Sequence, residues 1–277
     1  MPGRVEGKVA FITGAARGQG RSHALRLAEE GADVIAVDIC SPVATVGYPG
    51  ATPDDLDETA KLVQKLGRRV VAVQADVREQ GALDDAVRRG VAELGRLDIV
   101  CANAGILTMA LTHEQSEEQW QTMLDVNLTG VWHTVKAAIP VLIDQGHGGS
   151  IIITSSMAGL KGTPNCSSYT AAKFGVVGLA KTLAHELAPH RIRVNTVHPT
   201  NVETTMVDNA LVRSIFRPDL EQPTAEDAKD VYASINIWPE PWIQPVDVSN
   251  AVLYLASDEA RYTTGIALPV DLGATAK

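Results

Sequence analysis

The sequence predicts an α/β fold: a doubly wound parallel sheet of about seven strands with helices on both faces. Short runs rich in valine and isoleucine alternate with longer amphipathic runs along all 277 residues. The short runs are apolar on both faces, which is typical of parallel strands covered by helices on both sides. No internal repeat or linker interrupts the alternation, so we expect residues 1–277 to form one domain.

The elements follow in order along the chain. The expected strands are Val9–Thr13, Asp33–Asp38, Arg69–Asp76, Leu97–Asn103, Gly149–Ser156, Ile192–Pro199 and Ile266–Asp271. Helical spacing of apolar residues lies between them, in Gln19–Glu30, Leu56–Leu66, Ala82–Leu94, Glu117–Ile143, Tyr169–Leu187 and Val246–Ala256. Ligands of such folds bind at the carboxyl ends of the strands, so the residues after each strand are the candidate site.

Two segments are too long and irregular to be ordinary connections, which take about 2–6 residues in α/β units. The insertion at residues 41–55 follows a strand end, and we expect it to form a flap over a cofactor; a surface decoration is the alternative. The segment 201–245 follows the sixth strand and is expected to form a substrate lid or a satellite hydrophobic cluster. Its apolar pocket would use Met206, Phe216, Trp238 and Trp242.

Composition narrows the class of protein. The chain is 45% hydrophobic and 21% charged, with a formal net charge of −9. That acidity disfavours nucleic-acid and anionic-lipid partners. Its three cysteines have no paired spacing, so we expect no metal site and no disulfide framework. We find no signal-peptide pattern and no apolar run of membrane-spanning length, which predicts a cytoplasmic protein without a membrane partner.

A glycine turn follows the first strand. Gly14, Gly18 and Gly20 have the spacing GxxxGxG, with Arg17 and Gln19 between them, and a helix begins there. Glycines permit a tight turn and close approach of a pyrophosphate, which the helix N-terminus attracts. Alone, the glycines are equally consistent with a purely structural turn.

The second strand ends in a carboxylate. Asp38, next to Ile39, lies about 20 residues beyond the glycines, where it can accept both ribose hydroxyls of NAD. Its charge would repel the 2′-phosphate of NADP, although Arg17 could pair with that phosphate. We therefore predict NAD, with a helix N-cap or an ordinary loop carboxylate as the alternative role for Asp38.

The third and fourth strands also end in polar and small residues. Asp76 and Val77 could contact the adenine, with Asp76 accepting from its amino group. Asn103, Ala104 and Gly105 offer small residues beside the cofactor and one amide to tie strands together. Ordinary turn chemistry would explain either group.

A serine, a tyrosine and a lysine form the candidate catalytic group. Tyr169 and Lys173 lie at i and i+4 on one helical face, and Ser156 ends the fifth strand. A nearby cation favours phenolate, so we expect Lys173 to lower the tyrosine pKa from about 10. Tyr169 would then act as acid or base, while Ser156 hydrogen-bonds a substrate oxygen.

These motifs together resemble the short-chain dehydrogenase/reductase family along essentially the whole chain. The resemblance implies a Rossmann-type domain and a tetrad of Asn127, Ser156, Tyr169 and Lys173, in which Asn127 holds a water in a proton relay. The alternative for Asn127 is a polar residue that kinks a long helix. The resemblance also implies that Pro199, Val202 and Thr204 reach the nicotinamide and phosphates. Thr200 departs from the family's usual glycine, which leaves the local backbone conformation open.

Several loops resemble a narrower subgroup, the carveol dehydrogenase-like, mycofactocin-coupled enzymes. They are TGAARGQGRSHA, YPGATPDDLDET, GRR, VHPTNVETTM, FRPDLEQPT and SDEARYTTG. This resemblance implies a tightly bound, possibly non-exchangeable NAD, a cyclic or terpenoid secondary alcohol, and an external redox carrier. The family resemblance further implies a homotetramer in which Glu117–Ile143 and Tyr169–Leu187 pair between subunits.

We therefore expect an NAD-dependent oxidoreductase that interconverts a small apolar secondary alcohol and its ketone. A 3-oxoacyl thioester reductase shares the fold and tetrad, but Asp38 and the acidic surface disfavour it. A non-catalytic NAD sensor would have no need of Ser156, Tyr169 and Lys173.

Overall fold

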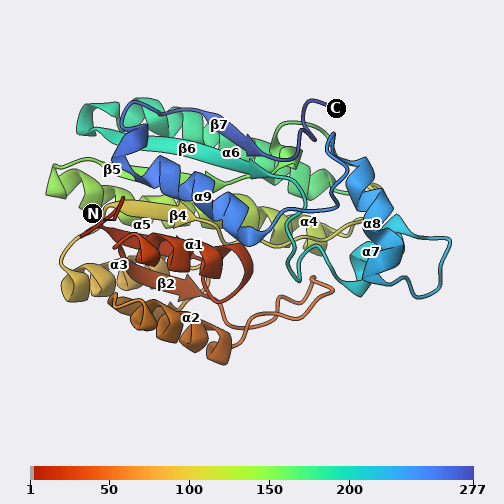
Figure 1. The fold of residues 1–277 in the computed structure, drawn as a ribbon, viewed down its shortest axis with the longest axis horizontal. Helices are drawn as coiled ribbons and strands as arrows, with labels where there is room; N and C mark the ends of the chain where they lie inside the picture. The colour runs from red at the N-terminus through yellow and green to blue at the C-terminus, as the bar shows by residue number, and fades with distance from the viewer. Residues whose placement is uncertain (1–2) are drawn as a thin grey trace.

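A computed structural model describes residues 3–277 and contains a seven-stranded, all-parallel sheet in the order β3-β2-β1-β4-β5-β6-β7 (Figure 1). The predicted fold class is confirmed. The strands are β1 Val9–Thr13, β2 Asp33–Asp38, β3 Val70–Gln74, β4 Ile99–Ala102, β5 Gly149–Thr154, β6 Ile192–Pro199 and β7 Ala267–Val270. Three strand boundaries match the prediction. The other four strands are shorter because residues at their ends, including Asp76, Asn103 and Ser156, have left the sheet.

Helices cover both faces of the sheet, so each strand contributes to two cores. On one face lie α1 Gly18–Glu29, α2 Pro53–Lys65 and α9 Pro245–Ala256, and on the other α3 Gln80–Leu94, α5 Gly130–Gln145 and α6 Ser167–Glu186. Within β1, Phe11 belongs to the core under α3, α5 and α6, and Ile12 to the core under α1 and α9. The period-2 alternation of side chains along a strand produces this division.

Local capping explains where α2 begins. The Thr52 side chain accepts a hydrogen bond from the Asp55 backbone N–H, and the Asp55 carboxylate accepts one from the Thr52 backbone N–H. Pro53 occupies the first helical turn. This capping box starts the helix three residues before the expected Leu56. The segment 201–245, expected to be irregular, contains two short helices, α7 Ala210–Phe216 and α8 Ala225–Ser234.

The long predicted helix Glu117–Ile143 is divided by a π-helical turn. It comprises α4 Glu117–Leu124, the π turn Asp125–Thr129 and α5. Within residues 3–277, the run Glu117–Gln145 has the length and mean hydropathy, 1.2 in its best window, of a membrane span. The expectation that no apolar run reaches membrane-spanning length is therefore wrong as regards length and composition. Here the helix covers the sheet, and Val135, Ala138 and Leu142 are buried in the core.

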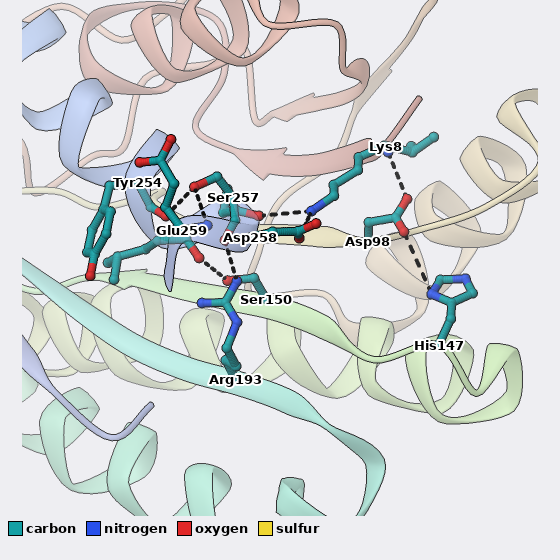
Figure 2. Close-up of polar contacts among 12 residues, drawn as sticks. Lys8, Asp98, His147, Ser150, Arg193, Tyr254, Ser257, Asp258 and Glu259 are labelled. Atoms are coloured by element: carbon teal, nitrogen blue, oxygen red, sulfur yellow. Dashed lines mark hydrogen bonds and ion pairs between the residues drawn. The ribbon is translucent and has the colours of Figure 1, made fainter. Parts of the chain in front are cut away.

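A polar network closes the amino-terminal edge of the sheet (Figure 2). Lys8 Nζ lies 2.7 Å from Asp258, Ser150 Oγ donates to the Leu255 carbonyl, and Arg193 donates to that of Ser257. These contacts join the starts of β1, β5 and β6 to the end of α9. The opposite, carboxyl edge remains open to a ligand, and both long irregular segments project beyond it (Figure 1).

Candidate active site

A cavity of about 360 Å³ lies at the carboxyl edge of the sheet, where strand order reverses between β1 and β4. This reversal is the usual ligand site of doubly wound folds. Most residues predicted to hold a cofactor line it, namely Gly14, Arg17, Gly18, Gln19, Gly20, Asp38, Ile39, Asp76, Val77, Asn103, Ala104, Gly105 and Thr204. The structure therefore brings together motifs that are far apart in the sequence.

The glycine turn is shaped by close backbone packing. Gly18 has φ +54°, a conformation that other residues rarely adopt. A Cβ on Gly20 would lie 2.0 Å from the Gly14 carbonyl oxygen, so no larger residue fits where α1 meets the turn. The turn thus presents backbone N–H groups and a helix N-terminus to the cavity.

Asp38 is held in place at the end of β2. Its Oδ2 accepts from the Ala16 backbone N–H at 3.0 Å and its Oδ1 from that of Cys40 at 3.1 Å. The side chain is buried but lines the cavity, and each carboxylate oxygen has a further lone pair for a ligand hydroxyl. Asp38 is therefore an oriented acceptor in this cavity.

The insertion forms one wall of the cavity. Ser41, Val43, Val46 and Tyr48 line it, and the Tyr48 hydroxyl accepts from the Leu107 backbone N–H at 3.1 Å. The Arg17 guanidinium donates to the Pro49 carbonyl at 2.5 Å and lies 6.0 Å from the Tyr48 ring centroid. In this arrangement Arg17 supports the insertion.

Asp76, after β3, and Asn103, after β4, line the cavity and also make hydrogen bonds within the protein. Asp76 pairs with Arg78, whose side-chain and backbone hydrogen bonds hold the pKa of that carboxyl below its usual value against the opposing effect of burial. The Asn103 amide donates to the Thr13 carbonyl at 3.0 Å and accepts from Thr154. Asn103 thereby ties β4 to β1 and β5, as predicted.

The segment after β6 matches the prediction only in part. Thr204 lines the cavity, whereas Pro199 pairs within the sheet and Val202 is buried against Ile243. Neither Pro199 nor Val202 lines the cavity. Thr200 does not have a positive φ, so its replacement of glycine causes no backbone strain.

A second cavity of about 490 Å³ adjoins the candidate catalytic group. Ser156 and Tyr169 line it, and most of the remaining wall is apolar. The apolar side chains are Leu107, Met109, Met157, Ala158, Pro164, Met206, Val207, Val212, Ile215, Phe216 and Ile235. Such a cavity fits a small apolar molecule with one polar group directed toward Ser156 and Tyr169.

The expected effect of Lys173 on Tyr169 is wrong for this structure. Lys173 Nζ donates to the Thr154 carbonyl at 2.7 Å and lies 5.5 Å from the Tyr169 ring centroid. Burial raises the pKa of Tyr169, and a hydrogen bond with Ser156 opposes that rise. Burial also lowers the pKa of Lys173 to about 8. Burial, which sequence spacing does not reveal, has the largest effect on the pKa of Tyr169, and Lys173 is not among the groups that shift it.

Asn127 lies in the π turn and contacts the loop after β4. Its Oδ1 accepts from the Ile106 N–H and its Nδ2 donates to the Ile106 carbonyl, both at 2.8 Å. A Cβ on Gly105 would lie 3.1 Å from Asn127 Oδ1 and 3.7 Å from Lys173 Nζ. The two polar groups therefore converge on Gly105, where a larger residue would crowd both.

The predicted lid pocket is half correct. Met206 and Phe216 line the second cavity, but Trp238 is 64% exposed. Trp242 does not line the cavity; it packs on Tyr232 with ring centroids 5.6 Å apart, in a satellite cluster that includes Val212. Helical spacing gave no orientation for these tryptophans because they lie outside regular helices.

Sequence reasoning missed the loop between Ser156 and Tyr169. Thr163, Pro164 and Asn165 line the second cavity. Their position in the sequence between two candidate catalytic residues could have indicated that they line the site. Cys166 also lines this cavity, and burial raises its pKa to about 11, which disfavours a reactive thiolate.

The chain is similar in sequence and in structure to known dehydrogenases. Residues 8–213 match the family described as short chain dehydrogenase. The chain is 57% identical over 275 residues to (−)-trans-carveol dehydrogenase of Rhodococcus erythropolis, covering 99% of both chains. It is 56% identical to the solved carveol dehydrogenase of Mycobacterium avium in complex with NAD, with a TM-score of 0.98 and coverage of 99% and 100%.

A more distant solved relative agrees with these matches. A short chain dehydrogenase of Mycobacterium paratuberculosis bound to NAD is 44% identical, with a TM-score of 0.92 and coverage of 99% of this chain and 100% of that chain. The family match extends from the first strand through the tetrad positions to α7. This chain therefore belongs to the short-chain dehydrogenase family.

Proposed function

We propose that this protein is an NAD-dependent dehydrogenase that interconverts a small, apolar secondary alcohol, carveol-like and cyclic, with its ketone. The observation that carries the proposal is the apolar second cavity, whose polar lining includes Ser156 and Tyr169 beside the nucleotide-sized first cavity. Relatives named carveol dehydrogenase support the substrate class.

The residues of the first cavity fit NAD. Gln19 Oε1 is buried there without a hydrogen-bond partner, which leaves an acceptor for a ligand donor. The N-terminus of α1, which has no side-chain cap, suits a pyrophosphate. The Asp38 carboxylate suits two unphosphorylated ribose hydroxyls. A 2′-phosphate would meet a buried negative charge at the same point.

The chain's own residues would hold the substrate and move its proton. When bound, NAD+ supplies the hydride acceptor and a positive charge that favours the phenolate form of Tyr169. Tyr169 Oη takes the alcohol proton, and Ser156 hydrogen-bonds the substrate oxygen. Lys173, ionised below about pH 8, would bind the nicotinamide ribose and would belong to the proton relay together with Asn127.

Tyr169→Phe tests this assignment. Removing the hydroxyl should lower kcat for cyclic secondary alcohols by about 10²- to 10⁴-fold, the usual contribution of a positioned acid or base. NAD binding, measured by calorimetry, should be unchanged. Tyr262→Phe is the matched control, because Tyr262 is 90% exposed. Near-normal turnover in the Tyr169 variant would overturn the proposed chemistry.

We also propose a redox carrier, a homotetramer and a cytoplasmic location for this protein. The insertion that walls the first cavity supports a tightly held NAD, which would need an external, mycofactocin-like redox carrier for reoxidation. Exposed Trp132 on α5 and Phe174 on α6 support a homotetramer assembled through these helices. Three buried free cysteines support a reducing, cytoplasmic location.

A further inference from the structure

Ser156 lies just beyond the point where the backbone ladder between β5 and β6 ends. β5 ends at Thr154, and the Ser155 backbone N–H still donates to the Val197 carbonyl at 2.9 Å. On the neighbouring strand, Pro199 has no N–H with which to extend the ladder. The position of Ser156 therefore depends on side-chain contacts and on the turn that follows it.

The His198 imidazole makes one of these contacts. His198 lies on β6 and is fully buried, and its Nδ1 is 2.8 Å from the Ser156 carbonyl oxygen. A carbonyl oxygen only accepts, so Nδ1 carries the hydrogen. The Nε2 atom lies 2.6 Å from the hydroxyl oxygen of Thr196, two residues earlier on the same face of the strand. The two contacts fix the orientation of the ring.

The ring is neutral in this arrangement. Burial lowers the pKa of His198 from 6.5, so the ring carries no charge at pH 7. A neutral ring with its hydrogen on Nδ1 accepts at Nε2, and the Thr196 hydroxyl donates there. The other acceptor near this hydroxyl, the Ile266 carbonyl, is more distant, at 3.4 Å. A chain of hydrogen bonds thus runs from Thr196 through His198 to the Ser156 carbonyl.

The carbonyl and the hydroxyl of Ser156 both hold the 3-10 turn Met157–Gly159. The carbonyl also accepts from the Gly159 N–H at 2.9 Å, and Oγ accepts from the Ala158 N–H at 3.1 Å. The same side chain is hydrogen-bonded to Tyr169. A contact that fixes the plane of the carbonyl therefore also restrains the hydroxyl.

We infer that His198 is a positioning residue, which holds the Ser156 hydroxyl toward Tyr169 and the substrate oxygen through its hydrogen bond to the Ser156 carbonyl. His198 lines neither the first nor the second cavity, so it acts through Ser156 and does not touch the ligand. This inference rests on the proposed function for the role of Ser156. A histidine that only packs the core is the alternative.

Two variants separate hydrogen bonding from packing. His198→Leu removes the donor and should lower kcat/KM for cyclohexanol by about 3- to 10-fold, the value of one neutral hydrogen bond. His198→Asn places an amide N–H near the position of Nδ1 and should restore most of the rate. Calorimetry should show unchanged NAD affinity in both. In His198→Leu the Ser156 carbonyl keeps the Gly159 N–H, so no acceptor there loses its last partner.

A double-mutant cycle with Ser156→Ala decides between the two roles, because that change removes the hydroxyl and keeps the carbonyl. If His198 acts through the hydroxyl, His198→Leu should cost less than about 2-fold in the Ser156→Ala background. The full loss in both backgrounds would indicate packing and overturn the inference. Single-turnover rates measure the slow variants. Should His198→Leu fail to fold, Thr196→Val removes the contact that orients the ring, and the same cycle applies.

A crystal structure of His198→Leu tests the geometry without a substrate. The Ser156 hydroxyl should be displaced or occupy a second rotamer, whereas an unmoved hydroxyl would overturn the inference. If the unmodified enzyme oxidises no cyclic alcohol, the proposed function fails, and a displaced hydroxyl would still support the role of His198.

Discussion

The Asp38 carboxylate accepts two backbone N–H groups, which orient it toward the first cavity. We predict that Asp38→Asn lowers kcat/KM for NAD by about 10- to 100-fold, because a hydrogen bond to a charged group is worth about 1.5–3 kcal/mol. The relative preference for NADP should rise as the repelling charge is removed. Parallel titrations with both nucleotides measure this, with exposed Asp54→Asn as control. An unchanged NAD-to-NADP ratio would contradict the assignment.

The Tyr169 phenol has its pKa raised by burial and lowered by a hydrogen bond with Ser156. Alcohol oxidation needs the deprotonated form, so its rate should increase with pH, and ketone reduction should decrease. Ser156→Ala removes the stabilising hydrogen bond and should move the oxidation profile upward by up to about one pH unit, besides lowering the rate. Profiles of kcat/KM in both directions measure the shift. A lower rate with an unmoved profile would restrict Ser156 to substrate orientation.

The insertion between β2 and α2 connects the two cavities. Tyr48 lines the first cavity and binds the backbone of Leu107, which lines the second. A Cβ on Gly47 would lie 3.0 Å from a Leu211 methyl carbon, so the insertion also meets α7 of the lid segment. The insertion therefore lines the cavity that would hold the cofactor, and its role as a flap stays a prediction.

Deleting Val43–Ala51 should accelerate NAD release, because the cavity would lose one wall and the Tyr48 contact. Tyr48→Phe removes only the hydroxyl and should accelerate release by about 3- to 10-fold, the value of one neutral hydrogen bond. Stopped-flow fluorescence of bound NADH measures the rate. Turnover at saturating NAD should persist in Tyr48→Phe, since the tetrad is untouched. If neither change affects release, the insertion is a surface decoration.

The His23 side chain connects α1 to α9 and affects the stability of the whole molecule. It is fully buried and its Nδ1 lies 2.8 Å from Ser249 Oγ. Burial lowers its pKa from 6.5 to about 4. Below pH 6.5 the unfolded chain binds a proton that the folded chain excludes until about pH 4. The free energy of unfolding should therefore fall as the pH decreases through this window.

At pH 5 the expected loss is on the order of 2 kcal/mol relative to pH 7, from about 1.5 pH units at 1.36 kcal/mol each. Urea unfolding at both pH values measures it. The variant His23→Gln should lose this part of the pH dependence, whereas His185→Gln, on an exposed helix surface, should retain it. Equal slopes in all three proteins would contradict the linkage.

The sequence by itself determined the features that depend on local patterns. Apolar runs buried on both faces identified the strands, and β1, β2 and β6 have the predicted bounds. Glycine spacing identified the turn, where Gly18 requires a positive φ. Tyr169 and Lys173 could be paired from their helical spacing alone. These features are local because strand period, helix period and turn chemistry act within a few residues.

The tertiary structure decided what depends on contacts between distant segments. It oriented Met206 and Phe216 into the cavity while leaving Trp238 exposed, and it placed Thr163 beside Ser156 and Tyr169 in the second cavity. It also reversed the expected direction of the pKa shift of Tyr169, because the surrounding elements bury the phenol. Desolvation and side-chain orientation arise from packing across the whole molecule, which no local pattern records.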